Sequence, residues 1–374
     1  MVHSENKLDG FEIEKEFLID YIKKVVKTDE RNEAIFAHCI EYHTFESSVQ
    51  NISRAYTGKP SVMISKICDE YLGKIVEVDG EDAISNMKVV VPNLHPLEAC
   101  LWLKNRTNSS TGTPFYLYST LALNKIMLKD LGSMLTQKPI NTAAPYVYAP
   151  SVQVSPTSVQ RFYAIQEFAY EKSDNLLKLI RDGLVGSQYK FIDTMTGTTK
   201  KVDFRVDDDV FFNLAQENIL GGDNKKFVYG PEYAVKNKKI SSYNSTVISE
   251  ISSTGAYKQG STDFRSYNDF DKASEHKRKI IGKALQNFLA KAPISITVNG
   301  REFITGDANY SIGQVIRIIF LDNTQERGEN RPIIDTKKSG DYIICGAKHV
   351  IKYERFDSVL LCGKLASFGD EVTF

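Results

Sequence analysis

PISITVNGREFI (residues 293–304) opens the last quarter of the chain, and three further apolar segments follow it: SIGQVIRIIFLD (311–322), GDYIICGAKHVIK (340–352) and FDSVLLCGKLAS (356–367). Apolar and polar residues alternate strictly from Ile294 to Val298, which is typical of a half-buried strand. An amphipathic stretch at 271–291 precedes them, with Ile280, Ala284 and Leu285 on one helical face. This order predicts a small β-barrel that closes on itself, with one helix packed on it.

Length and charge set the broad class of the protein. The chain has 374 residues, which predicts two or three domains, and 42% hydrophobic residues, which is ordinary for globular proteins. It carries 47 Lys and Arg against 47 Asp and Glu, so the net charge is zero. No basic excess is present to neutralise a phosphate backbone, which argues against nucleic-acid binding by bulk charge. Zero net charge also does little to oppose self-association.

The cysteines and the first residues predict a soluble protein made in a cytoplasm. The five cysteines form no CxxC pair, and we expect them to be buried, reduced thiols: Cys39, Cys68, Cys100, Cys345 and Cys362. The opening residues MVHSENKLDG contain no apolar signal core. No apolar run reaches the ~18–20 residues that a membrane span needs.

The first half predicts alternating helices and strands. For Glu12 to Val26, periodicity leaves a strand pair and a helix both open, because apolar residues recur at mixed spacings. Pro60 near a first turn and an apolar stripe from Met63 to Leu72 predict a helix. The other predicted elements are a strand from Ala34 to Phe45, a strand from Met87 to Val91, a helix after His95-Pro96, a strand from Pro114 to Ser119 and a helix from Lys125 to Leu135.

The second half begins after a proline-rich connection. The predicted elements are a strand from Val159 to Tyr170, a helix capped by Asp174 that ends at Gly183 to Gly186, a hairpin of 189–193 with 200–206, and a strand from Thr246 to Ile251. The polar stretch from Asp207 to Asn244 predicts a long excursion with weak structure. The domain prediction is a first tube-like barrel abbreviated at its N-terminus (1–57), a mixed α+β domain (58–140), a linker (141–158), and a second tube-like barrel (159–206 and 246–368) with the packed helix 271–291 and an insertion (207–245).

Residue types that serve catalysis or metal binding occur, but each has a structural explanation. His38, Cys39 and His43 are metal-ligand types, yet neighbours on a strand point to opposite faces. Asp207-Asp208-Asp209 lacks the glycine and distal glutamate of an EF-hand loop. His349 lies in a strand pattern, where a hydrogen-bonded structural histidine is expected, and Lys236 to Lys239 predicts a solvated loop. Without a Gly-x-Ser-x-Gly elbow or a P-loop, the sequence predicts no catalytic, cofactor-binding or metal-binding residues and no cofactor.

Three segments carry a family resemblance. They are Asn51 to Leu72 (NISRAYTGKPSVMISKICDEYL), Val91 to Leu135 with its Pro-Asn and His-Pro helix start and the strand PFYLY, and Pro293 to Ser367 with ITVNG (296–300), Gly306-Asp307, SGDYII (339–344) and His349. In this order they resemble the central hub proteins of contractile phage baseplates. That family also supplies the N-terminal part of the VgrG spikes of type VI secretion. Only about 57 residues precede the first apolar helix, so either the first barrel is abbreviated or another chain completes it.

The resemblance implies an α+β chain with two tail-tube-like β-barrels and helical or mixed insertions. Three copies would form a homotrimeric, pseudo-hexameric ring. It implies a non-enzymatic baseplate hub subunit of a contractile phage tail or related injection machine, an adaptor that joins the tail tube to the cell-puncturing spike around a central channel. The implied partners are the spike, the tail tube or tube-initiator protein, baseplate wedge proteins and the tape measure protein, with DNA only in transit. The implied location is the virion tail baseplate, after synthesis in the host cytoplasm.

Two alternatives from other functional classes stay open at this stage. A virion-associated peptidoglycan hydrolase would need a cleft with a pair of carboxylates, one of them with a raised pKa. A receptor-binding tail protein would need exposed aromatic platforms, which the 19 Tyr and 20 Phe permit.

Overall fold

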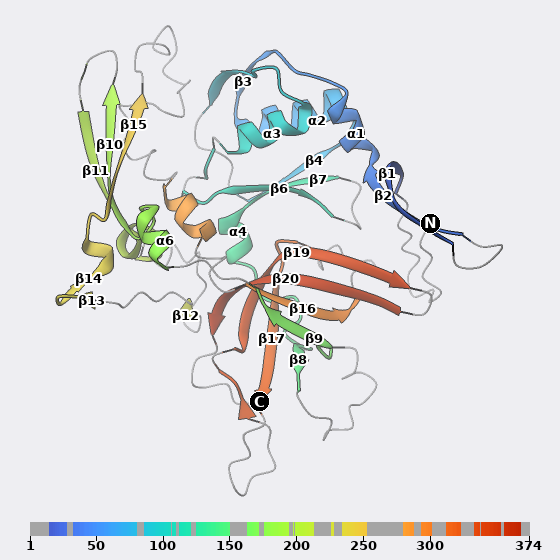
Figure 1. Ribbon diagram of the computed structural model, residues 1–374. Coiled ribbons are helices and arrows are strands. Elements are labelled where there is room, and N and C mark those ends of the chain that lie inside the picture. Colours follow the sequence, from blue (N-terminus) through green and yellow to red (C-terminus); the bar gives the residue numbers. More distant parts are fainter. Residues whose placement is uncertain are drawn as a thin grey trace, which may run out of the picture.

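The computed structural model describes residues 15–27, 33–80, 86–105, 107–109, 112–120, 125–149, 163–171, 176–193, 197, 199–212, 226–227, 234–252, 280–287, 293–300, 312–322, 333–336, 338–352 and 355–367. These residues form a mixed α+β structure in which sheets predominate. Three regions built on sheets surround a central group of short helices (Figure 1).

The N-terminal half packs two helices against small sheets. Its elements are β1 (Phe17–Lys27), β2 (Glu33–Glu41), α1 (Tyr42–Ser48), β3 (Ala55–Gly58), α2 (Pro60–Leu72), β4 (Val76–Asp79), β5 (Met87–Val90), α3 (Pro96–Lys104), β6 (Phe115–Ser119), β7 (Ile126–Asp130) and α4 (Leu131–Leu135). The predicted helices after Lys59 and His95 are confirmed. Pro60 begins α2, and Gly73 ends it with a left-handed φ of 56°. A capping box of His95 and Glu98 begins α3.

The segment from Lys125 to Leu135 corrects a prediction. It is a strand, β7, followed by the short helix α4, and not one helix. β7 lies between β4, which is parallel to it, and β6, which is antiparallel. All five residues of β7 are buried. A strand covered on both faces has no alternation of polar residues, so its apolar run gave the same pattern as a helix face.

An eight-stranded sheet contains the described strands of the last quarter of the chain. Its strands are β8 (Tyr146–Tyr148), β9 (Glu167–Tyr170), β12 (Lys226–Phe227), β16 (Pro293–Asn299), β17 (Val315–Asp322), β18 (Ile333–Ile334), β19 (Gly340–Lys352) and β20 (Arg355–Ser367). The four strands predicted for this region are confirmed with shorter first and second members. Ile294, Ile296 and Val298 are fully buried, as their alternation predicted.

This sheet curls into a half-barrel (Figure 1). Its main path runs β18-β17-β19-β20-β16-β9, and among the described residues β18 and β9 do not pair with each other. The predicted closed barrel is therefore corrected to an open sheet. Within 1–57, the described residues form the hairpin β1–β2, the helix α1 and β3, which pairs with β5, and the first barrel expected there stays a prediction.

Part of the predicted linker belongs to the sheet. β8 pairs in parallel with β17, and Tyr146 is buried in the half-barrel core. The Asn141 side chain holds the same strand, since its Oδ1 accepts from the Arg317 N–H at 2.6 Å and its Nδ2 donates to the Arg317 carbonyl at 3.0 Å. The described part of the connection is thus docked, and residues 150–162 lie outside the described residues.

A separate three-stranded sheet contains β10 (Gly186–Asp193), β11 (Thr199–Arg205) and β15 (Thr246–Ser252). The predicted hairpin of β10 and β11 is confirmed, and β15 adds in parallel on the other side of β10. The helix predicted for 271–291 is described at 280–287, and α6 (Leu176–Arg181) follows the position predicted for its cap.

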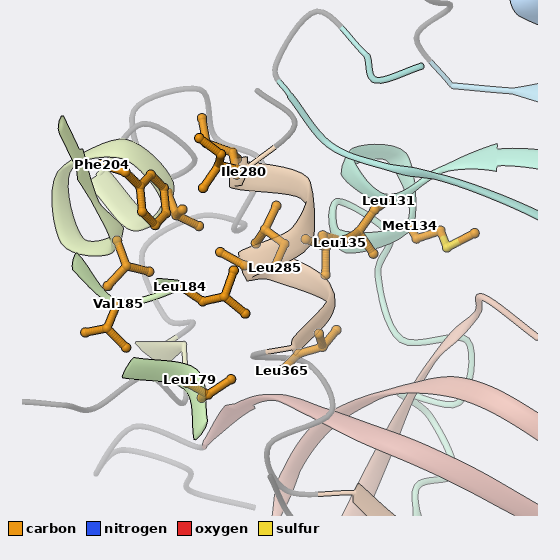
Figure 2. Close-up of a cluster of buried hydrophobic side chains, with 14 of the residues drawn as sticks. Leu131, Met134, Leu135, Leu179, Leu184, Val185, Phe204, Ile280, Leu285 and Leu365 are labelled. Atoms are coloured by element: carbon orange, nitrogen blue, oxygen red, sulfur yellow. The ribbon is translucent and has the colours of Figure 1, made fainter. Parts of the chain in front are cut away.

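One core joins the three regions. Leu131 and Leu135 of α4, Leu179 of α6, Phe204 of β11 and Leu285 of the helix at 280–287 meet there (Figure 2). Val315, Ile343 and Leu365 bring the half-barrel into the same cluster. Within the described part of the chain, no helix has the length and apolar character needed to cross a bilayer.

Candidate interaction surface

The residue types considered for metal binding lie apart from one another. His38 lies on β2 with its Nδ1 3.2 Å from Asp20 Oδ2, whereas His43 belongs to α1 with its Nδ1 3.2 Å from Glu41 Oε2. Cys39 is exposed on the opposite face of β2 from His38. In the described segments, no group of three or more His, Cys, Asp or Glu side chains is arranged to hold a metal ion.

The remaining polar candidates hold local structure. Asp209 accepts a hydrogen bond from the Arg205 N–H at 2.8 Å, and Asp207 accepts one from the Ser241 hydroxyl, in a π-helical turn (Asp207–Phe212). His349 Nδ1 lies 2.7 Å from Ser358 Oγ on the neighbouring strand, and burial lowers the pKa of His349. Lys236 to Lys239 forms the turn and second strand of a small hairpin, 234–239, and Lys238 Nζ lies 4.7 Å from the centre of the Tyr243 ring.

The hairpin β1–β2 is the most exposed apolar element of the described chain. It lies at the edge of the N-terminal half (Figure 1). Seven large apolar or aromatic side chains of this hairpin are exposed: Phe17, Ile19, Tyr21, Ile22, Val25, Ile35 and Phe36. An isolated two-stranded hairpin is marginally stable in water, and it needs further strands or another element to cover an apolar face.

Two register shifts sort these side chains into two different faces. Asp20 has no partner on β2, since the pair Ile19↔Cys39 is followed directly by Tyr21↔His38. Lys23 likewise has none, since Ile22↔Ala37 is followed by Lys24↔Phe36. Each shift is a β-bulge that places one extra residue on β1. Successive pairs alternate between the two faces. Apolar residues spaced three apart in sequence therefore reach one face, although a regular strand would separate them.

Three of the pairs that point to the first face, Ile19↔Cys39, Ile22↔Ala37 and Val25↔Ile35, contain only apolar side chains and one thiol. All six of these residues are exposed. We call this set the apolar face of the hairpin. The second face includes Tyr21, whose ring stacks on His38 with centroids 4.9 Å apart, together with Lys24 and Phe36. A contiguous exposed apolar patch of this kind marks an interaction site in soluble proteins.

A charged network fixes the base of the hairpin to the body. Lys15 Nζ donates to Glu41 Oε1 at 2.9 Å and to the Thr120 carbonyl at 2.7 Å, and Glu41 Oε2 contacts His43. Burial lowers the pKa of His43, Glu41 opposes this shift, and the nearby Lys74 and Lys15 add to it. A cavity of about 430 Å³ lies between the hairpin base and the end of α2, and its lining includes Lys15, Glu41, His43 and Lys74.

Sequence reasoning identified the apolar residues of β1 but not their common face. The signal was the spacing of three between Ile19, Ile22 and Val25, which fits neither a regular strand nor a full helical stripe. That spacing is also what two bulges in one strand produce.

Neither a family model nor a curated protein matches the sequence. Among solved structures, the chain is similar to the tail protein from Neisseria meningitidis MC58, with a TM-score of 0.51 and 10% identity over 93% of this chain and 79% of that one. The prophage MuSo2 43 kDa tail protein from Shewanella oneidensis aligns over 92% of this chain and 78% of its own at 9% identity, with a TM-score of 0.47, too weak to support an inference. The chain therefore shares its overall fold with the Neisseria tail protein.

Proposed function

We propose that the protein is a structural subunit of a contractile phage tail or a related injection machine. The observation that carries this proposal is the fold likeness to a tail protein over 93% of the chain. The hub-like motifs at 51–72, 91–135 and 293–367 support the same assignment from the sequence. Within the described segments, no observation favours a hydrolase, whereas the exposed aromatic residues Tyr21 and Phe36 of the hairpin also meet the requirement of a receptor-binding protein.

In its finer form, the proposal is a baseplate hub subunit without enzymatic activity. Three copies form a ring around a central channel and join the tail tube to the cell-puncturing spike. The partners are the spike, the tail tube or tube-initiator protein, wedge proteins and the tape measure protein, and DNA passes through the channel. Cyclic closure of this kind requires each copy to present two different surfaces to its neighbours.

We assign the apolar face of the hairpin to the contact between copies. The face is exposed in a single chain, and its members carry no charge. Removing this apolar surface from water would therefore stabilise a contact between copies. Lys27 and Glu33 form the pair at the turn end of the hairpin and give the face a polar border. An apolar centre with a polar rim is the usual anatomy of a protein interface.

Mass in solution tests the assembly, using light scattering on a sizing column across protein concentration. The expected result is a trimer that persists at high salt, because burial of apolar area is not screened by ions. A monomer at every concentration in the absence of other tail proteins would contradict self-assembly of this subunit.

A matched pair of variants tests the face. Ile22→Glu places a charge on the apolar face, and Phe36→Glu places the same charge on the opposite face at nearly equal exposure, 57% against 56%. Ile22→Glu should dissociate the trimer, whereas Phe36→Glu should retain it. Equal effects of the two variants would reject the assignment of this face. Circular dichroism checks that both variants remain folded.

Location in the particle is a separate test. Antibody labelling of intact virions, viewed by electron microscopy, should place the protein at the end of the tail where the spike emerges. Labelling along the whole tail, or on the head, would reject the hub position while leaving the tail fold untouched.

A further inference from the structure

Cys68 and Cys100 bring two thiols together inside the N-terminal core. Cys68 lies on α2 and Cys100 on α3, and both side chains are fully buried. Their sulfur atoms are 3.7 Å apart, close enough for a thiol–thiol hydrogen bond. The two residues are 32 positions apart in sequence, and the segment between them includes β4 and β5.

The two thiols are not equivalent. The hydrogen bond from the Cys100 thiol lowers the pKa of Cys68, and burial opposes that shift. The same hydrogen bond and burial both raise the pKa of Cys100. Cys68 is therefore the sulfur better able to carry the thiolate, which is the form that reacts with oxidants.

We propose that Cys68 and Cys100 are an oxidation site that closes to an intramolecular disulfide when the protein meets a peroxide. The Cys68 thiolate takes one oxygen from hydrogen peroxide and becomes a sulfenic acid, and the other oxygen leaves as water after protonation. The Cys100 sulfur then attacks the Cys68 sulfur, which releases a second water. Two thiols are oxidised by two electrons, and one peroxide is reduced to two water molecules.

Closure requires the two sulfur atoms to move toward each other. A disulfide needs a sulfur–sulfur distance of about 2.05 Å, so the two atoms must approach by roughly 1.7 Å from the 3.7 Å seen here. Both residues are on regular helices whose other core contacts hold them side by side. Full burial limits access, so the reaction is expected to be slow and to follow local opening of the core.

The bond would fasten α2 to α3 and restrict the unfolded chain between them. A tail subunit is made in a reducing cytoplasm and works outside the cell, so this closure would follow release from the host. That timing rests on the proposed function. The chemistry itself does not, because it needs only the folded chain and a peroxide.

The test uses the purified full-length protein in hydrogen peroxide. After quenching, the protein is unfolded, its free thiols are alkylated, and peptides are mapped by mass spectrometry without reduction. The expected result is a peptide containing Cys68 joined to one containing Cys100, with the loss of two hydrogens, reversed by dithiothreitol. The unfolding midpoint of the oxidised protein should rise by roughly 5–10 °C.

Two variants sharpen the result. Cys100→Ala should abolish the cross-link, and Cys362→Ala, a buried cysteine on β20, should retain it. The wild-type map decides the question even if Cys100→Ala fails to fold. The proposal is overturned if Cys68 and Cys100 are both found alkylated, and therefore still reduced, after prolonged treatment with excess peroxide, or if Cys68 carries sulfinic acid without a cross-link. Neither outcome bears on the tail assignment, which the trimer and labelling experiments test.

Discussion

Gly186, the first residue of β10, lies where two segments of backbone approach each other closely. A Cβ added there would lie 2.3 Å from the Ser241 carbonyl oxygen and 2.5 Å from that of Tyr243. The Gly186 carbonyl also accepts from the Ser245 N–H and hydroxyl, which holds the two segments together. Only a residue without a side chain fits between them without backbone movement.

We predict that Gly186→Ala lowers the free energy of unfolding by about 2–4 kcal/mol, because the backbone must move to admit the methyl group. Gly346→Ala is the matched control, since the nearest atom to its added Cβ is Leu361 Cβ at 3.7 Å. Urea titration of both variants measures the difference. Equal stability of the two would show that the 241–243 segment yields without strain.

His43 predicts a pH dependence at the base of the hairpin. Because burial lowers its pKa in the folded state, the unfolded chain binds a proton at a higher pH than the folded chain. Stability contributed by the neutral ring is therefore complete above the unfolded pKa of about 6.5 and is lost as the pH falls below it. The free energy of unfolding should decline as the pH is lowered from above to below about 6.5. The decline should be larger for the wild type than for His43→Gln. A decline of the same size in His43→Gln would assign the effect to other groups.

At the scale of elements, the sequence predicted most strands and helices from local patterns. The four last strands, α2 and α3 were predicted because their apolar spacing or capping residues are unambiguous, as at Pro60 and His95. β7 was mistaken for a helix because both of its faces are buried. The face of β1 was missed because two bulges, at Asp20 and Lys23, break its alternation. The strand predicted from Ala34 to Phe45 ends at Glu41, where the helix α1 begins. These failures arise from tertiary contacts that local patterns do not encode.

Asn141 tests whether the docked connection contributes to the sheet. We expect Asn141→Ala to destabilise the protein by about 2–4 kcal/mol, since the buried amide makes two hydrogen bonds to the backbone of Arg317. The adjacent Thr142→Ala is the control, because Thr142 is exposed. Thermal unfolding of both variants gives the comparison. If Asn141→Ala matches its control, β8 is held by its strand pairing with β17 alone.

At the scale of the whole molecule, the central core is the feature that unites three sheets. Neither its partners nor the separation of β10, β11 and β15 from the half-barrel followed from the sequence, since strand patterns do not specify which sheet a strand joins. Leu285 lies fully buried where α4, α6 and the half-barrel meet. Its truncation should therefore weaken all three regions together.

We predict that Leu285→Ala lowers stability by about 2–5 kcal/mol and shifts one cooperative transition, because the cavity opens in a core shared by the three regions. Leu177→Ala, on α6 and 58% exposed, should change stability little. Calorimetry and hydrogen exchange together measure this. Separate transitions, with the N-terminal half unaffected, would show that the regions unfold independently.

The pairing of β8 with β17 also has a consequence for the order in which the parts of the protein fold during synthesis. Asn141 and its partner Arg317 are 176 positions apart, so Asn141 leaves the ribosome long before Arg317 is made. β9 likewise cannot pair until β16 has been synthesised. The N-terminal core is complete once Leu128 has emerged, so that half can fold while translation continues. β8 and β9 stay without their sheet until the last strands are made, and a nascent chain stalled before residue 293 would expose them both to other growing chains.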